Sequence, residues 1–375
     1  MKIAIVHDWL VTYGGAERVL AQVLVCFPEA DVFAVIDGLK QEERTFLKDK
    51  PVKTTVLQHL PGVFKHYRKL LPLMPWAMGR LNLSGYDVVI SSSHAVAKGV
   101  KLQAHQLHIC LCYSPMRYAW DLQDAYLKEA KLDTGLKGMA ARWVLKKIQQ
   151  WDFQTAQKVH HFIAISHYIA QRIQRNYGRS SVVIYPPVNV SGFSIKTQPA
   201  ENFYLTASRL VPYKQVALMV ATFNSLPQHQ FKVIGDGPEF NSIQAMAGPN
   251  VDILGHVPTH VLKDHLQRAK AFVFAADEDF GIAPLEAQAC GTPVIAYGKG
   301  GALETVKAEV APTGLFFAEQ SVESLKQAIL TFETQSFKPE DCRNNALQFS
   351  EAIFREKFTA TVMAYVDAFK QTCPK

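Results

Sequence analysis

Short apolar runs alternate along the chain with longer stretches whose apolar positions recur every three to four residues. The runs predict strands at 2–6, 31–36, 52–56, 86–91, 107–112, 159–164, 181–184, 203–207, 231–234, 251–253, 271–275 and 293–296. The longer stretches predict helices at 16–26, 140–157, 167–177, 239–247, 259–268 and 323–333. Because strands alternate with helices, the pattern predicts an α/β protein built from parallel, doubly wound sheets.

The alternation runs through the chain twice, and the two series are separated at Tyr185–Asn189, where two consecutive prolines stop a strand. The stretch 190–202 that follows is polar and without periodicity, and it is interpreted as a linker between domains. A length of 375 residues also favours two domains. We therefore expect two Rossmann-like domains, 1–187 and 188–349, facing a cleft at the carboxyl ends of their strands.

Charge is distributed unevenly over these two series. The net charge is +7, with 24 basic and 14 acidic residues in 1–187 but 16 and 19 in 188–375. A basic first half favours an anionic partner there, either nucleic acid, a phospholipid surface or a phosphorylated lipid. No apolar run reaches the ~18 residues of a membrane span, and Met1–Asp8 predicts a buried strand rather than a secretion signal. We therefore expect a cytoplasmic protein.

Six cysteines are scattered along the chain, and none of them forms a Cys-x-x-Cys pair. Cys110 and Cys112 lie two residues apart in an apolar run, so they share one face of an expected strand. The pair is either a metal or redox site or two buried thiols. We favour buried thiols because no second pair of ligands follows.

Two motifs offer groups that bind phosphate. Gly14-Gly15 follows the first strand and opens a helix, where free N–H groups favour an anion; the alternative is an ordinary strand-to-helix turn. Arg209 and Lys214 follow the first strand of the second half, where two cations can clamp a diphosphate; the alternative is a solvated surface pair. Gly235-Asp236-Gly237 is interpreted as a tight structural turn. The sequence lacks Gly-x-Gly-x-x-Gly, which counts against an NAD enzyme.

The segment 276–306 combines acids, glycines and a helix start. A strand ends in three acids, a turn at Phe280-Gly281 follows, and a helix begins after it. Glu278 lies in the turn and Glu286 is expected in the first helical turn, so both carboxylates can face one pocket and accept hydrogen bonds from sugar hydroxyls. The alternative for Glu286 is an acid that stabilises the helix N-terminus.

Three segments of the first half each have a functional and a structural interpretation. His94 follows an expected strand, and it either contacts a sugar or is a hydrogen-bonded loop histidine. Tyr113–Trp120 places aromatic residues around Arg117. The aromatic rings could stack on a sugar while Arg117 pairs with a phosphate, or the segment is a packed interdomain loop. Phe64–Arg80 mixes basic and bulky apolar residues. It is either a surface that contacts a membrane or a lipid acceptor, or a core helix pair with a solvated basic face.

Taken together, these residues resemble the nucleotide-sugar transferases of glycosyltransferase family 4, and the resemblance covers essentially the whole chain. It is carried by Glu278-x7-Glu286, the Phe280-Gly281 turn, Arg209 with Lys214, and Gly14-Gly15. Within that family the chain is most similar to bacterial mannosyltransferases of O-antigen and exopolysaccharide assembly, through His7–Trp9, Ser91–Gly99 and Ser114–Trp120.

The resemblance implies a GT-B fold, in which the last helix, at about 350–375, returns to the first, acceptor-binding domain while the second domain binds the donor. It also implies α-retaining transfer without a metal or other cofactor. The implied site residues fall into three groups: for catalysis, Glu278, Arg209, Lys214 and His94; for donor binding, Gly14, Gly15, Phe280, Gly281, Ile282 and Glu286; and for the acceptor, Tyr113, Arg117 and Tyr118.

In these roles Arg209 and Lys214 hold the diphosphate and stabilise the charge that develops on the leaving nucleotide. Glu278 and the backbone that follows it hold the sugar, Glu286 binds the ribose, and His94 lies beside the sugar. The resemblance also implies that the departing phosphate oxygen itself deprotonates the acceptor hydroxyl, and no side chain of the sequence is an obvious nucleophile.

We therefore expect an enzyme that transfers a sugar, mannose from GDP-mannose in preference to a UDP-sugar, to a lipid-linked saccharide. The expected partners are the nucleotide sugar, this acceptor and the anionic inner face of the cytoplasmic membrane, and not nucleic acid. Two alternatives stay open. A sugar-nucleotide epimerase or hydrolase on the same fold releases nucleotide without an acceptor, and a non-catalytic subunit binds the sugar nucleotide without turnover.

Overall fold

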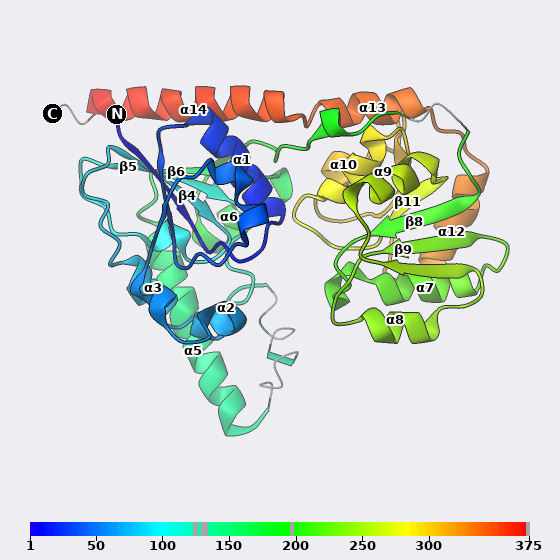
Figure 1. Cartoon of the computed structure of the whole chain (residues 1–375), viewed down its shortest axis with the longest axis horizontal. Helices are drawn as coiled ribbons and strands as arrows, with labels where there is room; N and C mark the ends of the chain where they lie inside the picture. Colours follow the sequence, from blue (N-terminus) through cyan, green and yellow to red (C-terminus); the bar gives the residue numbers. More distant parts are fainter. Residues whose placement is uncertain (122, 124–126, 129–133, 196–198, 373–375) are drawn as a thin grey trace. The chain divides into compact units, whose positions relative to one another are not determined.

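The computed structural model describes residues 1–121, 123, 127–128, 134–195 and 199–372. The chain divides into two compact units, which are both drawn in Figure 1. Unit 1 comprises Met1–Tyr185 and Phe354–Lys375, and unit 2 comprises Pro186–Ile353. Each unit is built on one parallel sheet, so the predicted α/β architecture is confirmed.

The sheet of unit 1 has the strand order β3-β2-β1-β4-β5-β6-β7. Its strands are β1 (Ile3–His7), β2 (Asp31–Ala34), β3 (Val52–Thr54), β4 (Val88–Ser93), β5 (Leu107–Cys112), β6 (His161–Ala164) and β7 (Ser181–Val183). Every residue of β1, β4 and β5 is buried, because helices cover both faces of a doubly wound sheet. Cys110 and Cys112 lie in β5 and are 0% and 1% exposed, which confirms them as buried thiols.

The helices of unit 1 are α1 (Gly15–Cys26), α2 (Val63–His66), α3 (Met74–Met78), α5 (Gly135–Ala156), α6 (His167–Tyr177) and most of α14 (Glu351–Thr372). Local signals set the ends of α6. The Ser166 hydroxyl accepts a hydrogen bond from the Ile169 N–H, and Gly178 stops the helix in the left-handed conformation, at φ 67°.

The C-terminal helix α14 packs on unit 1 through polar and aromatic contacts. The Arg355 guanidinium donates to the Gln22 side-chain oxygen at 2.7 Å, and the Tyr365 ring stacks on His161 with centroids 3.8 Å apart. Phe358 is fully buried, and its ring lies 6.2 Å from that of Phe27, the residue that follows α1. These contacts are what join the end of the chain to its first unit.

The sheet of unit 2 has the order β10-β9-β8-β11-β12-β13. Its strands are β8 (Phe203–Ala207), β9 (Gln230–Ile234), β10 (Val251–Gly255), β11 (Ala271–Phe274), β12 (Val294–Tyr297) and β13 (Gly314–Phe317). Its helices are α7 (Val216–Asn224), α8 (Phe240–Met246), α9 (Thr259–Arg268), α10 (Ile282–Ala289), α11 (Ala302–Thr305), α12 (Val322–Glu333) and α13 (Pro339–Leu347). Helices α7, α8 and α12 share one core with one face of this sheet, while α9 and α13 contact α10 on the other side (Figure 1).

Several elements differ from the sequence-based expectation. The strand β13 and the helices α7 and α13 were not predicted: β13 spans only four residues, and α7 lacks a polar face because most of it is buried. The interpretation of 190–202 as a linker is wrong for its first residues. Arg343 donates to the carbonyl oxygens of Val190 and Phe193 at 2.9 and 2.7 Å, which fixes them to unit 2. Residues 196–198 lie outside the described part.

Candidate functional site

In each sheet the strand order reverses at one point, between β1 and β4 in unit 1 and between β8 and β11 in unit 2. At such a point the loops that follow the two strands run to opposite faces, which leaves a crevice at the carboxyl edge. β1 pairs with β4 in the register His7↔Ser92, and β8 pairs with β11 in the register Tyr204↔Ala271. The segments after these four strands contain all four predicted catalytic residues.

In unit 2 the structure brings Lys214 and Glu278 into direct contact. Lys214 ends the short 3-10 turn Pro212–Lys214 after β8, and Glu278 lies in the loop after β11. The Lys214 Nζ donates to Glu278 Oε1, and the two side chains are 16% and 17% exposed. Because this pair is mostly shielded from water, its attraction is stronger than that of a surface pair. The carboxylate thus positions a cation at the switch point of the sheet.

Arg209 follows β8 by two residues, and its side chain is exposed. Its loop is fixed from the neighbouring strand, since the Ser208 N–H donates to the Ile234 carbonyl oxygen at 3.0 Å. Gly235 makes this approach feasible: its φ is 139°, and a Cβ there would lie 1.8 Å from the Ser208 carbonyl oxygen. The glycine turn is therefore structural, as predicted, and it holds the loop that carries Arg209.

The loop that carries Glu278 is held by two glycines that the sequence analysis did not single out. The Gly301 N–H donates to the Glu278 carbonyl oxygen at 2.7 Å, and a Cβ on Gly301 would lie 2.3 Å from the Phe280 Cα. A Cβ on Gly300 would lie 2.5 Å from the Glu278 carbonyl oxygen. The signal for these contacts was available, because Gly298-Lys299-Gly300-Gly301 directly follows β12, the strand next to β11.

The predicted donor residues of unit 2 lie where this loop becomes helix α10 and within that helix. Phe280 is 4% exposed and packs on Phe349, so its backbone rather than its ring is available to a ligand. Gly281 has φ 94° and caps the helix, which starts at Ile282. Glu286 is therefore the fifth residue of α10 and lies in its second turn, so its predicted place in the first turn is wrong. Its side chain is half-buried.

In unit 1 the Asp8 carboxylate organises the loop that carries His94. Asp8 follows β1, is fully buried, and accepts hydrogen bonds from the four successive backbone N–H groups of residues 94–97 at 2.6–3.0 Å. Its Oδ2 also lies 2.9 Å from the His94 Nδ1. Asp8 was given no role of its own from the sequence, although it directly follows the first strand, at the carboxyl edge where such sheets bind ligands.

Burial and charge oppose each other in this pair. Burial raises the pKa of Asp8, but the adjacent His94 and His7 outweigh it, and the pKa lies well below its usual value. Burial lowers the pKa of His94, but the charge of Asp8 and the hydrogen bond to it outweigh that effect, and the pKa of His94 is raised. The His94 side chain is 29% exposed. The pairing therefore favours an ionised Asp8 and a protonated His94, and the His94 side chain still reaches solvent.

The Gly14-Gly15 turn differs from the expected free phosphate site. The Gly14 N–H donates to Glu17 Oε2 at 2.9 Å, and Glu17 Oε1 lies 3.4 Å from the His7 Nε2. Burial raises the pKa of Glu17, but the hydrogen bond to His7 outweighs it and the pKa is lowered. A carboxylate thus stands at the start of α1, which disfavours a second anion beside it.

The three predicted acceptor residues have different environments. Tyr113 is 8% exposed, and its hydroxyl lies 2.9 Å from the Ser92 Oγ and 3.2 Å from the Ala16 carbonyl oxygen. Arg117 and Tyr118 are half-buried. The positive charge of Arg117 acts on His94 and lowers its pKa, against the larger effect of Asp8. Tyr113 is therefore a packing residue behind the loop, whereas the other two remain accessible.

No helix among the described residues combines the length and the hydropathy needed to cross a membrane. Within those same residues, no three His, Cys, Asp or Glu side chains gather in a way that would hold a metal ion.

Two family models match the chain in succession. The model described as Glycosyltransferase Family 4 matches residues 13–191, and the model described as Glycosyl transferases group 1 matches residues 191–349. The first covers the segment with Gly14 and His94, and the second covers Arg209, Lys214 and Glu278.

Curated relatives match parts of the chain. It is 33% identical over 138 residues to a GDP-mannose-dependent monoacylated alpha-(1-6)-phosphatidylinositol monomannoside mannosyltransferase of Corynebacterium glutamicum, covering 33% of this chain and 35% of that protein. It is 31% identical over 146 residues to the O-antigen chain mannosyltransferase RfbU of Salmonella typhimurium, covering 36% and 41%. The chain spans between 30% and 56% of the length of the curated relatives it matches.

Among solved structures, HepE of Anabaena in complex with UDP superposes with a TM-score of 0.71. The alignment covers 97% of this chain and 100% of that one at 19% sequence identity, which shows a shared fold.

Proposed function

This chain belongs to the GT-B glycosyltransferases, and we propose that it is a retaining mannosyltransferase that uses GDP-mannose and a lipid-linked saccharide acceptor. The resemblance drawn from the motifs is confirmed at the level of the family. The donor, the stereochemistry, the acceptor and the residue roles that follow are the content of the proposal.

The observation that carries the proposal is the contact between Lys214 and Glu278 at the switch point of the unit 2 sheet. Arg209 follows the same strand as Lys214, and the amide end of α10 follows the same loop as Glu278. A guanidinium, an ammonium and a helix N-terminus together suit a diphosphate. The adjacent carboxylate suits the hydroxyls of a sugar attached to it.

In this proposal Arg209 and Lys214 bind the diphosphate and stabilise the negative charge on the leaving GDP. Glu278 and the Gly281 and Ile282 amides orient the mannose, and Glu286 binds the ribose. The departing phosphate oxygen takes the proton of the acceptor hydroxyl, and that hydroxyl attacks on the face that the phosphate leaves. Trapping a covalent glycosyl-enzyme would contradict this mechanism.

His94 acts in the proposal as a charged hydrogen-bond donor and not as a base. Its raised pKa favours the protonated imidazole, and Nδ1 lies 2.9 Å from the Asp8 Oδ2. An imidazolium stabilises a sugar–phosphate group but cannot accept a proton. This argues against an epimerase or hydrolase that uses His94 as its general base.

The names of the relatives support the donor and the acceptor class. Four of the matched mannosyltransferases are named as GDP-mannose-dependent enzymes acting on a phosphatidylinositol monomannoside, and RfbU is named for the O-antigen chain. Anabaena HepE has been solved with UDP-glucose, so a UDP-sugar is the competing donor. Peripheral contact with the inner face of the cytoplasmic membrane follows from a lipid-linked acceptor.

A thermal-shift panel of GDP, UDP, ADP and their sugar conjugates tests the donor assignment. A ligand at 100 times its Kd stabilises the native state by about 2.7 kcal/mol, so the cognate nucleotide raises the Tm most. We expect GDP and GDP-mannose to give the largest rise, and Arg209→Ala and Glu286→Ala to abolish it.

The outcomes separate the alternatives. Retention of the full shift by both variants would show that the donor is bound elsewhere. A larger rise in Tm with a UDP-sugar than with GDP-mannose would show that the donor is that UDP-sugar. Release of GDP at the same rate with and without a lipid-linked saccharide would favour a hydrolase, and binding without turnover would favour a non-catalytic subunit.

A further inference from the structure

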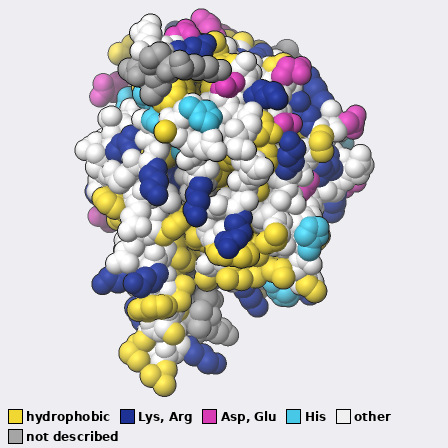
Figure 2. Space-filling model, turned by 90° about the vertical axis from the view of Figure 1, so that its left-hand side faces the viewer, with side chains coloured by type: hydrophobic (Ala, Val, Ile, Leu, Met, Phe, Trp, Pro, Cys, Tyr) yellow, Lys and Arg dark blue, Asp and Glu magenta, His cyan; other side chains and the backbone are white. Residues whose placement is uncertain are grey.

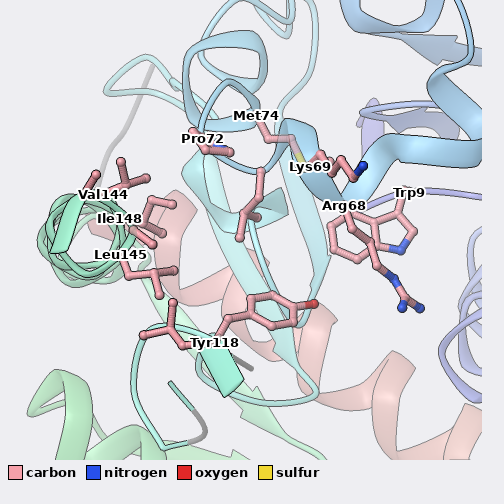
Figure 3. Close-up of a pocket in the computed structure, with 13 residues that line it drawn as sticks. Trp9, Arg68, Lys69, Pro72, Met74, Tyr118, Val144, Leu145 and Ile148 are labelled. Carbon is pink, nitrogen blue, oxygen red and sulfur yellow. The ribbon is translucent and has the colours of Figure 1, made fainter. Parts of the chain in front are cut away.

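Unit 1 contains a pocket of about 600 Å³, which is within the range of small-molecule sites. Figure 3 shows its walls, which include the segment around α2 and α3, helix α5, the loop that carries Tyr118, and the loop after β1 that carries Trp9. One of these walls belongs to the segment Phe64–Arg80, for which the sequence left two alternatives: a lipid-contacting surface and a core helix pair with a solvated basic face. Met74 is buried, as in a core helix pair, whereas Phe64 is 46% exposed.

The two ends of the pocket differ in chemistry. One end is formed by Val144, Leu145 and Ile148 of α5, with Pro72 and Met74 facing them (Figure 3). The other end is formed by Arg68 and Lys69, both exposed, and by Trp9. A cavity with an apolar body and a basic mouth is complementary to an amphiphile with an anionic head and a hydrocarbon chain.

The basic end adjoins the candidate site of unit 1. Trp9 lines the pocket, follows Asp8 in the chain, and its ring stands edge-on to the His94 imidazole, with centroids 4.7 Å apart. Tyr118, a predicted acceptor residue, also lines the pocket. The head of an occupant at this end therefore lies beside the loop that carries His94.

We propose that this pocket binds the hydrocarbon chain of the lipid-phosphate acceptor, with the phosphate at Arg68 and Lys69. The assignment rests on the proposed function, because an acceptor must reach the edge of the sheet where His94 lies. It deepens that function by placing the lipid of the acceptor inside unit 1 rather than leaving it in the bilayer.

A membrane surface is the competing occupant of this region. The outer side of α5 exposes Leu136, Met139 and Trp143 at 80%, 60% and 63%, and basic residues lie between them. Figure 2 shows hydrophobic side chains gathered on this projecting end of the helix, with Lys and Arg nearby. Because these residues differ from the ones that line the pocket, substitutions on one helix can separate the two kinds of binding.

The test is titration calorimetry of the full chain with n-alkyl phosphates below their micelle concentration, without nucleotide. We expect one molecule of dodecyl phosphate per chain, with affinity that rises from octyl to dodecyl by up to about fourfold per methylene. Inorganic phosphate alone should give no heat of binding. Dodecyltrimethylammonium, which carries the opposite charge on the same chain, should bind at least tenfold more weakly.

Two matched substitutions on α5 decide where the chain binds. Val144→Asp places a charge in the pocket and should weaken dodecyl phosphate binding at least tenfold. Met139→Asp, the same change on the exposed side of the helix, should leave the affinity within twofold. If Val144→Asp does not fold, Ala141→Trp, which fills the pocket without adding charge, should produce the same loss. Lys69→Glu should remove most of the preference for phosphate over ammonium.

Equal losses in the two aspartate variants would overturn the proposal in favour of adsorption through the exposed side of α5. Absence of wild-type binding, or equal binding of the ammonium amphiphile, would overturn it too. The donor panel is an independent readout on unit 2. A GDP shift without lipid binding refutes this inference alone, and lipid binding without any nucleotide shift refutes the transferase assignment while leaving a lipid-phosphate pocket.

Discussion

The Asp8 carboxylate pairs with the His94 imidazole across the switch point of the unit 1 sheet, with Oδ2 and Nδ1 2.9 Å apart. The two residues are 86 positions apart in the chain and meet because β1 and β4 are neighbours in register. The same carboxylate accepts the four N–H groups that begin with that of His94 itself. One buried acid thus sets both the backbone of the loop and the charge of the histidine on it.

Asp8→Asn should be among the most destabilising single substitutions in unit 1. An amide cannot supply the charge that offsets four amides and an imidazolium, and its NH₂ group would face N–H donors. We expect the free energy of unfolding to fall by about 3–5 kcal/mol. Asp31→Asn, at an acid that is 46% exposed, should cost about 1 kcal/mol or less. Similar losses from the two variants in urea denaturation would disprove a special role for Asp8.

The contribution of His94 to stability should depend on pH. Because its folded pKa lies above the ordinary histidine value of 6.5, the stabilisation is complete below that value and is lost as the pH rises through the folded pKa. The depressed pKa of Asp8 keeps its own contribution present above 3.8.

The measurement is the difference in unfolding free energy between the wild type and His94→Gln from about pH 5.5 to 9. It should be largest at the acidic end and decrease toward the basic end. His105→Gln, at an exposed histidine, should show no such trend. A difference that grows with pH would mean that His94 is neutral in the folded protein.

Lys214→Gln should reduce transfer far more than it reduces stability. The loss of one preorganised cation from the leaving group should lower kcat by about 10²–10³-fold. Lys270→Gln is the control, because Lys270 also pairs with a carboxylate, that of Glu333, but is more exposed, at 29% against 16%, and precedes β11, at the opposite edge of the sheet. Its kcat should stay within about twofold of the wild-type value. Equal effects of the two substitutions would contradict the placement of the diphosphate.

Gly301→Ala should displace the loop that carries Glu278. The added Cβ would meet the Phe280 backbone at 2.3–2.5 Å, so the loop must move or the sheet must open. We expect a loss of about 1–3 kcal/mol in stability together with loss of the GDP-dependent rise in Tm. Gly85→Ala, where a Cβ would meet nothing within 4 Å, should change neither quantity. A normal nucleotide shift in Gly301→Ala would show that this loop does not shape the donor site.

Much of this protein could be predicted from local patterns. Buried parallel strands require nearly continuous apolar runs, and helix ends require caps such as Ser166 and Gly178, so these elements can be located without knowing their neighbours. The residue types suited to diphosphate binding, Arg209 and Lys214, were also visible because they directly follow a strand. The Gly235 turn was recognised as structural for the same local reason.

What the sequence determined by itself was therefore the alternation of strands and helices and the chemistry available at the strand ends. Only the tertiary structure decided that β1 adjoins β4 and that β8 adjoins β11, and hence that Asp8 meets His94 and Lys214 meets Glu278. Strand order depends on how buried surfaces fit together over long separations in the chain, and no local period encodes it. The pocket that Trp9 lines arises in the same way, because its walls come from segments far apart in the chain that become neighbours only when unit 1 has folded.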